Sequence, residues 1–100
     1  MSPGENTRTE KILYLVTQPG CVNCPAAKAV VEEAFEDTDI PVETINLQEM
    51  DDDLEFRLLE EQVFIASTPS IIVDNGGDLK LLYSGEVPTV DGIRRELGVA

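Results

Sequence analysis

The chain has 100 residues, of which 42% are hydrophobic, 20 acidic and 7 basic, so one small domain with its own core is expected and the formal net charge is −13. This negative charge excludes nucleic acids and anionic membranes as expected partners, because both bind basic surfaces. No apolar run is long enough to cross a bilayer, and the N-terminus lacks the cationic start and apolar core of a signal peptide, so we expect a cytoplasmic protein.

The first third of the chain predicts a strand followed by a helix. An apolar run indicates a strand over 11–16 that is buried on both faces of a parallel sheet. Apolar residues then recur at helical spacing and predict a helix over 22–37, with Pro25 in its opening turn. The side chains expected to face inward are Ala27, Val30, Val31, Ala34 and Phe35. The polar residues 1–10 are predicted to be a flexible tail ahead of a single domain at 11–100.

A second strand and helix are predicted next. The β-branched residues favour a strand over 42–47. Three aspartates at 51–53 then open a helix over 54–62, where they suit N-terminal capping and the helix dipole. We prefer this role to a metal site, because nothing downstream completes an EF-hand ligand pattern. The inner stripe of the helix is predicted to be Leu54, Leu58 and Leu59.

The last part of the chain predicts a hairpin and a third helix. Strands over 70–73 and 79–83 are joined by a tight turn that contains Asn-Gly-Gly-Asp. Thr89 is the predicted N-cap of the final helix and Gly98 its stop. Its inward side chains are predicted to be Val90, Ile93 and Leu97. The order βαβαββα predicts one α/β domain in which helices cover both faces of the sheet.

The two cysteines of the chain, Cys21 and Cys24, lie where the first strand turns into a helix. Two thiols at C-x-x-C spacing can close a small disulfide ring and reopen it. The unpaired N–H groups and the positive dipole end of the helix stabilise a thiolate there. In a reducing compartment such a pair is more often catalytic or metal-binding than structural. We therefore expect dithiol–disulfide exchange.

Acidic residues are missing from two stretches, 11–31 and 62–73. A carboxylate close to a thiol raises the pKa of that thiol and lowers its reactivity. If the two stretches meet in space, they form a neutral patch around the cysteines on an otherwise negative protein. The overall acidity itself fits either a solvated surface or adaptation to high intracellular salt.

The order of these features resembles a minimal thioredoxin-fold protein over about residues 11–99. The resemblance rests on the C-x-x-C pair, on Thr68-Pro69 before the third strand and on a hairpin that leads into Ser84-Gly85. In length and order the chain is similar to glutaredoxins and to small archaeal glutaredoxin-like thioredoxins. The Pro-Gly-Cys-Val-x-Cys motif also resembles the redoxins that reduce ribonucleotide reductase. The resemblance implies a thioredoxin-like α/β fold, with a mixed four-stranded sheet flanked by helices, and neither a cofactor nor a metal.

The resemblance also implies roles for five residues. Cys21 would be the exposed attacking thiol and Cys24 the resolving thiol. Pro69 would be a cis proline facing the disulfide, and the backbone of Thr68 would pair with a substrate strand. Gly85 would let the substrate approach closely. The residues alone equally allow a trans Pro69 at the first position of a strand and Gly85 as a simple turn glycine.

Some positions depart from the families that the chain resembles. Apolar Leu15-Val16 stand where thioredoxins have a buried aspartate. The Gly-Gly-Asp part of the glutathione site of glutaredoxins is reduced to Gly85-Glu86, and only Lys11 and Lys28 near the cysteines could attract the glutathione anion. We therefore expect a monomer that acts on disulfide-containing protein substrates, in the reducing direction, and is renewed by an upstream reductase.

Other interpretations of the cysteine pair stay open. Two thiolates without histidine cannot fill a tetrahedral metal site, but a dimer that pools two C-x-x-C pairs could hold zinc or an iron–sulfur cluster. Visible absorbance or stoichiometric metal in purified protein would identify such a centre. The pair could also be two ordinary buried thiols, or idle thiols in an assembly partner that uses the fold as a scaffold.

Overall fold

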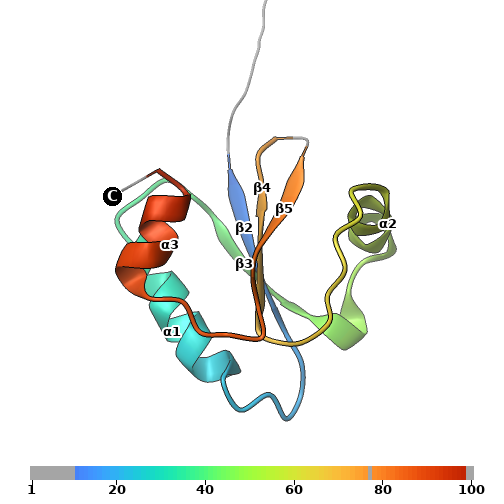
Figure 1. The fold of residues 1–100 in the computed structure, drawn as a ribbon, viewed down its shortest axis with the longest axis horizontal. Helices are drawn as coiled ribbons and strands as arrows, with labels where there is room; N and C mark the ends of the chain where they lie inside the picture. Colours follow the sequence, from blue (N-terminus) through green and yellow to red (C-terminus); the bar gives the residue numbers. More distant parts are fainter. Residues whose placement is uncertain (1–10, 77, 99–100) are drawn as a thin grey trace, which may run out of the picture.

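A four-stranded mixed sheet forms the centre of the structure, a computed structural model that describes residues 11–76 and 78–98 (Figure 1). The flexible tail predicted at 1–10 lies outside the described residues. The elements in chain order are β2 (Ile12–Thr17), α1 (Cys24–Phe35), β3 (Val42–Asn46), the 3-10 turn η1 (Leu47–Glu49), α2 (Asp52–Glu60), β4 (Ser70–Asp74), β5 (Leu79–Ser84) and α3 (Val90–Glu96). Within the described ranges, no helix is long and apolar enough to cross a membrane.

The strands are arranged in the order β3-β2-β4-β5. β2 runs parallel to β3, and α1 provides the crossover that a parallel pair needs. β4 runs antiparallel to both β2 and β5, and Val16 at the end of β2 pairs with Ser70 at the start of β4. The predicted element order, the parallel pair and the antiparallel hairpin are therefore confirmed.

The two faces of the sheet are covered unequally. Helices α1 and α3 lie against one face and α2 lies against the other (Figure 1). Leu13 and Leu15 of β2 belong to the core under α1 and α3, whereas Val16 belongs to the core under α2. These three side chains are fully buried, which confirms that β2 is covered on both faces.

Helix α1 is shorter than the predicted range and begins at Cys24, with Pro25 in its first turn. Proline suits this position because its missing N–H would have no partner inside the helix. Of the predicted inward residues, Val30 is only half-buried and the others are buried. Helix α3 agrees with its prediction, because Thr89 Oγ1 accepts a hydrogen bond from the Gly92 N–H at 3.0 Å.

Helix α2 corrects two expectations. Leu58 is buried and Leu54 packs against the core, but Leu59 is 58% exposed, so its predicted place on the inner stripe is wrong. Adjacent residues of a helix point about 100° apart, so Leu58 and Leu59 cannot both face the sheet squarely. The helix begins at Asp52 with Asp51 as its N-cap residue, but the Asp51 side chain forms no capping hydrogen bond. The acidic residues in the first turn favour the helix dipole instead.

An ion pair ties α2 to the sheet. Arg57 of α2 donates a hydrogen bond to Asp74, the last residue of β4, over 3.0 Å, and the Asp74 side chain is 9% exposed. The pKa of Arg57 is raised, chiefly by this hydrogen bond. Tyr14 lies nearby on β2, and burial raises its pKa, as do the negative charges of Asp74 and Glu43. Arg57 therefore compensates a carboxylate that is mostly removed from water.

Replacing this arginine should weaken the attachment of α2. Arg57→Gln removes the charge that compensates Asp74, and we expect the free energy of unfolding to fall by about 1–3 kcal/mol, limited by the partial exposure of Arg57. Urea denaturation of the wild type and the variant measures this change. The matched control is Arg95→Gln on the exposed surface of α3. Equal losses in the two variants would show that the pair with Asp74 adds nothing specific.

Candidate active site

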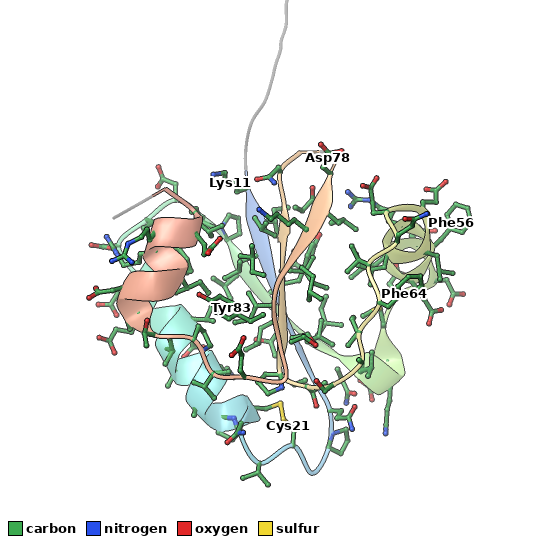
Figure 2. The ribbon with its side chains drawn as sticks, viewed as in Figure 1. Lys11, Cys21, Phe56, Phe64, Asp78 and Tyr83 are labelled. Atoms are coloured by element: carbon green, nitrogen blue, oxygen red, sulfur yellow. A yellow bond between two sulfur atoms is a disulfide. The ribbon has the colours of Figure 1, made fainter. Side chains whose placement is uncertain are left out.

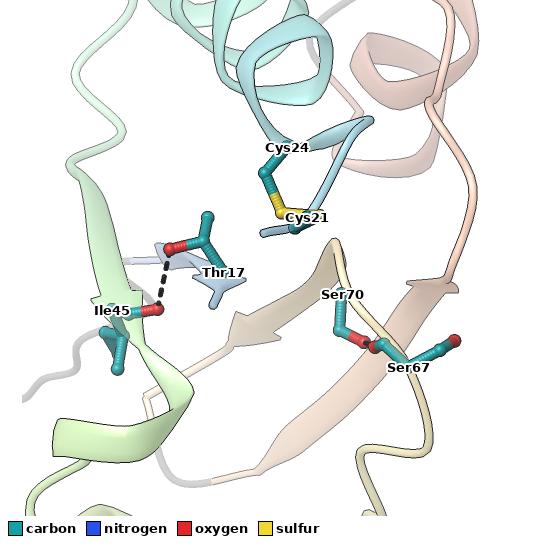
Figure 3. The surroundings of a disulfide bond; sticks show 6 residues. All are labelled: Thr17, Cys21, Cys24, Ile45, Ser67 and Ser70. Atoms are coloured by element: carbon teal, nitrogen blue, oxygen red, sulfur yellow. Dashed lines mark hydrogen bonds between the residues drawn. A yellow bond between two sulfur atoms is a disulfide. The ribbon is translucent and has the colours of Figure 1, made fainter. Parts of the chain in front are cut away.

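The two cysteines lie on the turn that connects β2 to α1. Thr17 ends β2, and its hydroxyl donates a hydrogen bond to the Ile45 carbonyl of β3 at 3.4 Å (Figure 3). The chain then turns back, and the Cys21 N–H bonds the Gln18 carbonyl at 3.2 Å. Gly20 has a φ of 82°, a left-handed conformation that glycine adopts without steric cost. This turn delivers Cys24 to the first position of α1.

Cys21 and Cys24 form a disulfide, with an S–S distance of 2.09 Å and a Cα–Cα distance of 5.4 Å. The two residues differ in accessibility: Cys21 is half-buried, whereas Cys24 is 7% exposed and belongs to the buried residues of α1. A partner can therefore reach the Cys21 sulfur more easily than the Cys24 sulfur.

The start of α1 provides a positive electrostatic environment for these sulfurs. No acidic residue lies in the first turn of the helix, and the side chain of the N-cap residue Asn23 forms no capping hydrogen bond. The first N–H groups of a helix have no partner within it, and the helix dipole adds partial positive charge. A thiolate released from the disulfide can therefore be stabilised by these N–H groups.

The segment before β4 lies at the same end of the sheet as the disulfide. The pairing of Val16 with Ser70 places this segment beside the end of β2, and Figures 2 and 3 show Cys21 next to it. The Thr68-Pro69 peptide bond is cis, as the resemblance implies. Pro69 is fully buried and Thr68 is half-buried. The Ser70 hydroxyl donates a hydrogen bond to the Ser67 carbonyl, which holds the segment in place.

The two stretches without acidic residues meet at this end, because one contains β2 and the start of α1 and the other contains most of β4. An open depression of about 420 Å³ lies beside the disulfide. Its described lining residues are Thr17, Gln18, Gly20, Cys21, Cys24, Pro25, Lys28 and Thr44. None of these residues is acidic, and Lys28 is the charged one among them. The described lining of the depression is therefore free of carboxylates, although it includes Lys28 and no residue of the second stretch.

Packing within the chain itself accounts for a glycine at position 85. Its φ is 77°, and a Cβ atom at this position would lie 2.3 Å from the Ser67 hydroxyl oxygen. Its N–H donates a hydrogen bond to the Pro69 carbonyl at 2.7 Å. Gly85 thus allows the turn after β5 to pack against the segment before β4. Close approach of a substrate at Gly85 stays a prediction.

Sequence reasoning missed Thr17 and Thr44 as neighbours of the cysteines. Both line the depression, and they reach it from adjacent strands of the parallel pair. The alternation of side chains along a strand shows which residues share a face, but not which residues of two strands are neighbours. That depends on the register, in which Leu15 of β2 pairs with Thr44 of β3. Leu15 and Val16 are fully buried in apolar clusters. These two positions of β2 therefore provide no carboxylate near the cysteines.

Comparisons with known proteins agree with this architecture. A family model described as a thioredoxin domain matches residues 11–97. Among curated protein sequences, no match to the chain is found.

Two solved structures illustrate the likeness. The first thioredoxin domain of mouse protein disulfide-isomerase A4 matches with a TM-score of 0.63 and 16% identity over 89% of this chain. This chain covers 61% of that chain. Thioredoxin 1 from the thermophilic eubacterium Thermosipho africanus matches with a TM-score of 0.57 and 16% identity, over 88% of this chain and 96% of that one. At such identities the likeness establishes the fold.

The packing of Gly85 leads to a stability prediction. Gly85→Ala introduces both an unfavourable φ and a clash with Ser67, whereas Gly98→Ala has a φ of 73° and nothing within 4 Å of the new Cβ. We expect Gly98→Ala to lower the free energy of unfolding by about 1 kcal/mol, and Gly85→Ala by up to about 1 kcal/mol more, because the exposed Ser67 hydroxyl must turn away and the Ser67 Cβ lies 3.3 Å from the new methyl group. Thermal and urea denaturation in the absence of substrate measure the difference. A Gly85→Ala protein as stable as Gly98→Ala would show that contact with Ser67 does not require the glycine.

Proposed function

Because the chain belongs to the thioredoxin domain family, we propose that it is a thiol–disulfide oxidoreductase that reduces disulfide bonds in other proteins. The observation that carries this proposal is the asymmetry of the pair: Cys21 is half-buried, Cys24 is 7% exposed, and both lie at the electropositive start of a helix. Such an arrangement favours an exposed attacking thiol and a protected resolving thiol.

The reaction begins from the reduced protein. The Cys21 thiolate attacks one sulfur of a partner disulfide, forms a mixed disulfide and releases the other sulfur as a thiolate. Cys24 then loses its proton and attacks the Cys21 sulfur, which releases the second partner thiolate and restores the Cys21–Cys24 disulfide. Two electrons pass from the dithiol to the partner, and an upstream reductase returns them to this protein.

The proton of Cys24 requires an acceptor. Fully buried apolar side chains occupy positions 15 and 16, where thioredoxins have a carboxylate. Cys24 does line the open depression beside the disulfide, together with the hydroxyl-bearing residues Thr17 and Thr44. We propose that water in this depression takes the proton, so that the resolving step needs no carboxylate from the protein.

The surroundings support a protein substrate rather than glutathione. Lys28 is the charged residue among those described in the lining of the depression, which provides little attraction for the glutathione anion. The cis Thr68-Pro69 segment lies beside the disulfide, where the backbone of Thr68 can pair with an extended substrate segment. Pro69 and Gly85 would border the bound segment. We propose further that the protein resembles the small archaeal glutaredoxin-like thioredoxins and the ribonucleotide-reductase redoxins in its role, and that it acts as a monomer in the cytoplasm.

The two cysteines should differ when each is replaced. In Cys24→Ser the first attack proceeds but resolution fails, so mixed disulfides with a model protein substrate should accumulate. In Cys21→Ser the attacking sulfur is lost and disulfide reduction should fall at least about 100-fold, to the level without protein. Insulin reduction and mass spectrometry of the trapped adducts measure both effects. Disulfide reduction by Cys21→Ser at the wild-type rate would reverse or remove the proposed roles.

The neutral surroundings of the pair should contribute to its reactivity. Val22 is 89% exposed, so Val22→Glu places a carboxylate beside Cys21 without disturbing the core. In protein whose disulfide has first been reduced, repulsion between the carboxylate and the thiolate should lower the rate of Cys21 alkylation by iodoacetamide at pH 7 about two- to threefold at low salt, and less at high salt. Val22→Gln is the matched control without charge. Equal rates for the two variants would show that local charge does not govern the reactivity of this thiol.

A further inference from the structure

A second surface of the molecule exposes large apolar side chains away from the disulfide. Phe56 and Leu59 of α2 are 61% and 58% exposed, and Phe64, which follows the helix, is 66% exposed. Leu59 and Phe64 border a groove of about 180 Å³ between η1, α2 and residues 63–65, which Met50 and Glu55 also line. We call this the α2 groove. Phe56 lies three residues before Leu59 and therefore extends the apolar surface along the helix.

These side chains are exposed on an ordered backbone. The chain leaves α2 through Gln62, whose φ is 59°, and the Val63 N–H then bonds the Leu58 carbonyl at 2.8 Å. This exit directs Val63 towards the core and leaves Phe64 in solvent (Figure 2). Among the residues that the structure describes, α2 is the one α-helix on this face of the sheet, and no second α-helix covers Phe64 or Leu59.

The rim of the α2 groove is strongly acidic. Residues 51–61 contain six acidic side chains and one basic side chain, Arg57. Arg57 forms an ion pair with Asp74, so its positive charge offsets the charge of Asp74 rather than that of the acidic residues of α2. Glu55 lines the groove directly, and Glu60 is exposed beside Leu59. The apolar groove is thus bordered by Glu55, and five further exposed acidic side chains lie on or next to the same helix.

We propose that the α2 groove is a docking site for a partner protein segment whose apolar side chains are flanked by Lys or Arg. The apolar side chains of such a segment would enter the groove beside Leu59 and Phe64, and its basic side chains would reach the acidic rim. Charge selects this occupant: a second copy of the chain carries a net charge of −13 and would be repelled, as would an anionic membrane.

Docking in the groove leaves the disulfide accessible. Neither cysteine lines the groove. Residues 65–69 connect the groove to the cis-proline segment, and an extended chain of this length spans at most about 14 Å. A partner bound in the α2 groove can therefore present another of its segments to Cys21. Binding itself requires no thiol chemistry, and it can be measured with the Cys21–Cys24 disulfide intact.

The test uses a fluorescent synthetic peptide with leucines and phenylalanine on one helical face and lysines on the other. Fluorescence anisotropy with the full chain in its disulfide form should show saturable binding that weakens as the salt concentration rises. Phe64→Ser and Leu59→Ser should each weaken binding about tenfold. Val87→Ser, which removes an exposed apolar side chain elsewhere, should not change it.

A charge control separates the α2 groove from general attraction to an acidic protein. Glu55→Lys with Glu60→Lys should weaken binding about tenfold, whereas Glu32→Lys with Glu33→Lys makes the same change of net charge on exposed residues of α1 and should have a much smaller effect. Equal effects of the two pairs would overturn the proposal.

Three further outcomes would also overturn it. The first is that a peptide with serine in place of the apolar residues binds as tightly as the original peptide. The second is that a peptide with glutamine in place of the lysines does so. The third is that the chain forms a dimer that Phe64→Ser disperses.

Discussion

The antiparallel pairing of β2 with β4 is the constraint on which the site depends. The pairing of Val16 with Ser70 brings the end of β2, and hence the cysteine turn, beside the segment that contains Pro69. The same pairing joins two stretches of chain without acidic residues. A disulfide at a helix start and a cis-proline segment therefore lie together because one pair of strands has one register. A slip of one residue would turn every side chain of β2 to the opposite face.

The two faces of the sheet are covered to different extents by helices, and the molecule therefore has two kinds of surface. Helices α1 and α3 cover one face and bury its core, and the first of them begins at Cys24. One short helix covers the other face, and Leu59 and Phe64 remain exposed at its edge. Six of the 20 acidic residues of the chain lie in residues 51–61, on or next to this second surface. One small domain thus presents a disulfide beside a carboxylate-free depression and, apart from it, an exposed apolar surface next to acidic residues.

Local patterns predicted the elements well, because their causes are local. The apolar run of β2, the start of α1 near Pro25 and the cap at Thr89 follow from burial, from the missing proline N–H and from a hydroxyl close to free N–H groups. The prediction that Leu59 faces inward was wrong, because the positions of three leucines in a helix do not show which of them the sheet can cover. The interaction of Gly85 with Ser67 joins residues 18 apart in the chain, so no local pattern could predict it.

The sequence by itself determined the chemistry: a C-x-x-C pair at the start of a helix, apolar residues in place of a buried carboxylate, and an α/β order that belongs to the thioredoxin domain family. Only the tertiary structure decided which sulfur is accessible, that Thr17 and Thr44 border the pair, and that α2 leaves an apolar groove open. Residue types and spacing reveal reactivity and local conformation. Exposure and neighbourhood depend on strand register and on which helix covers which face, and those are properties of the assembled chain.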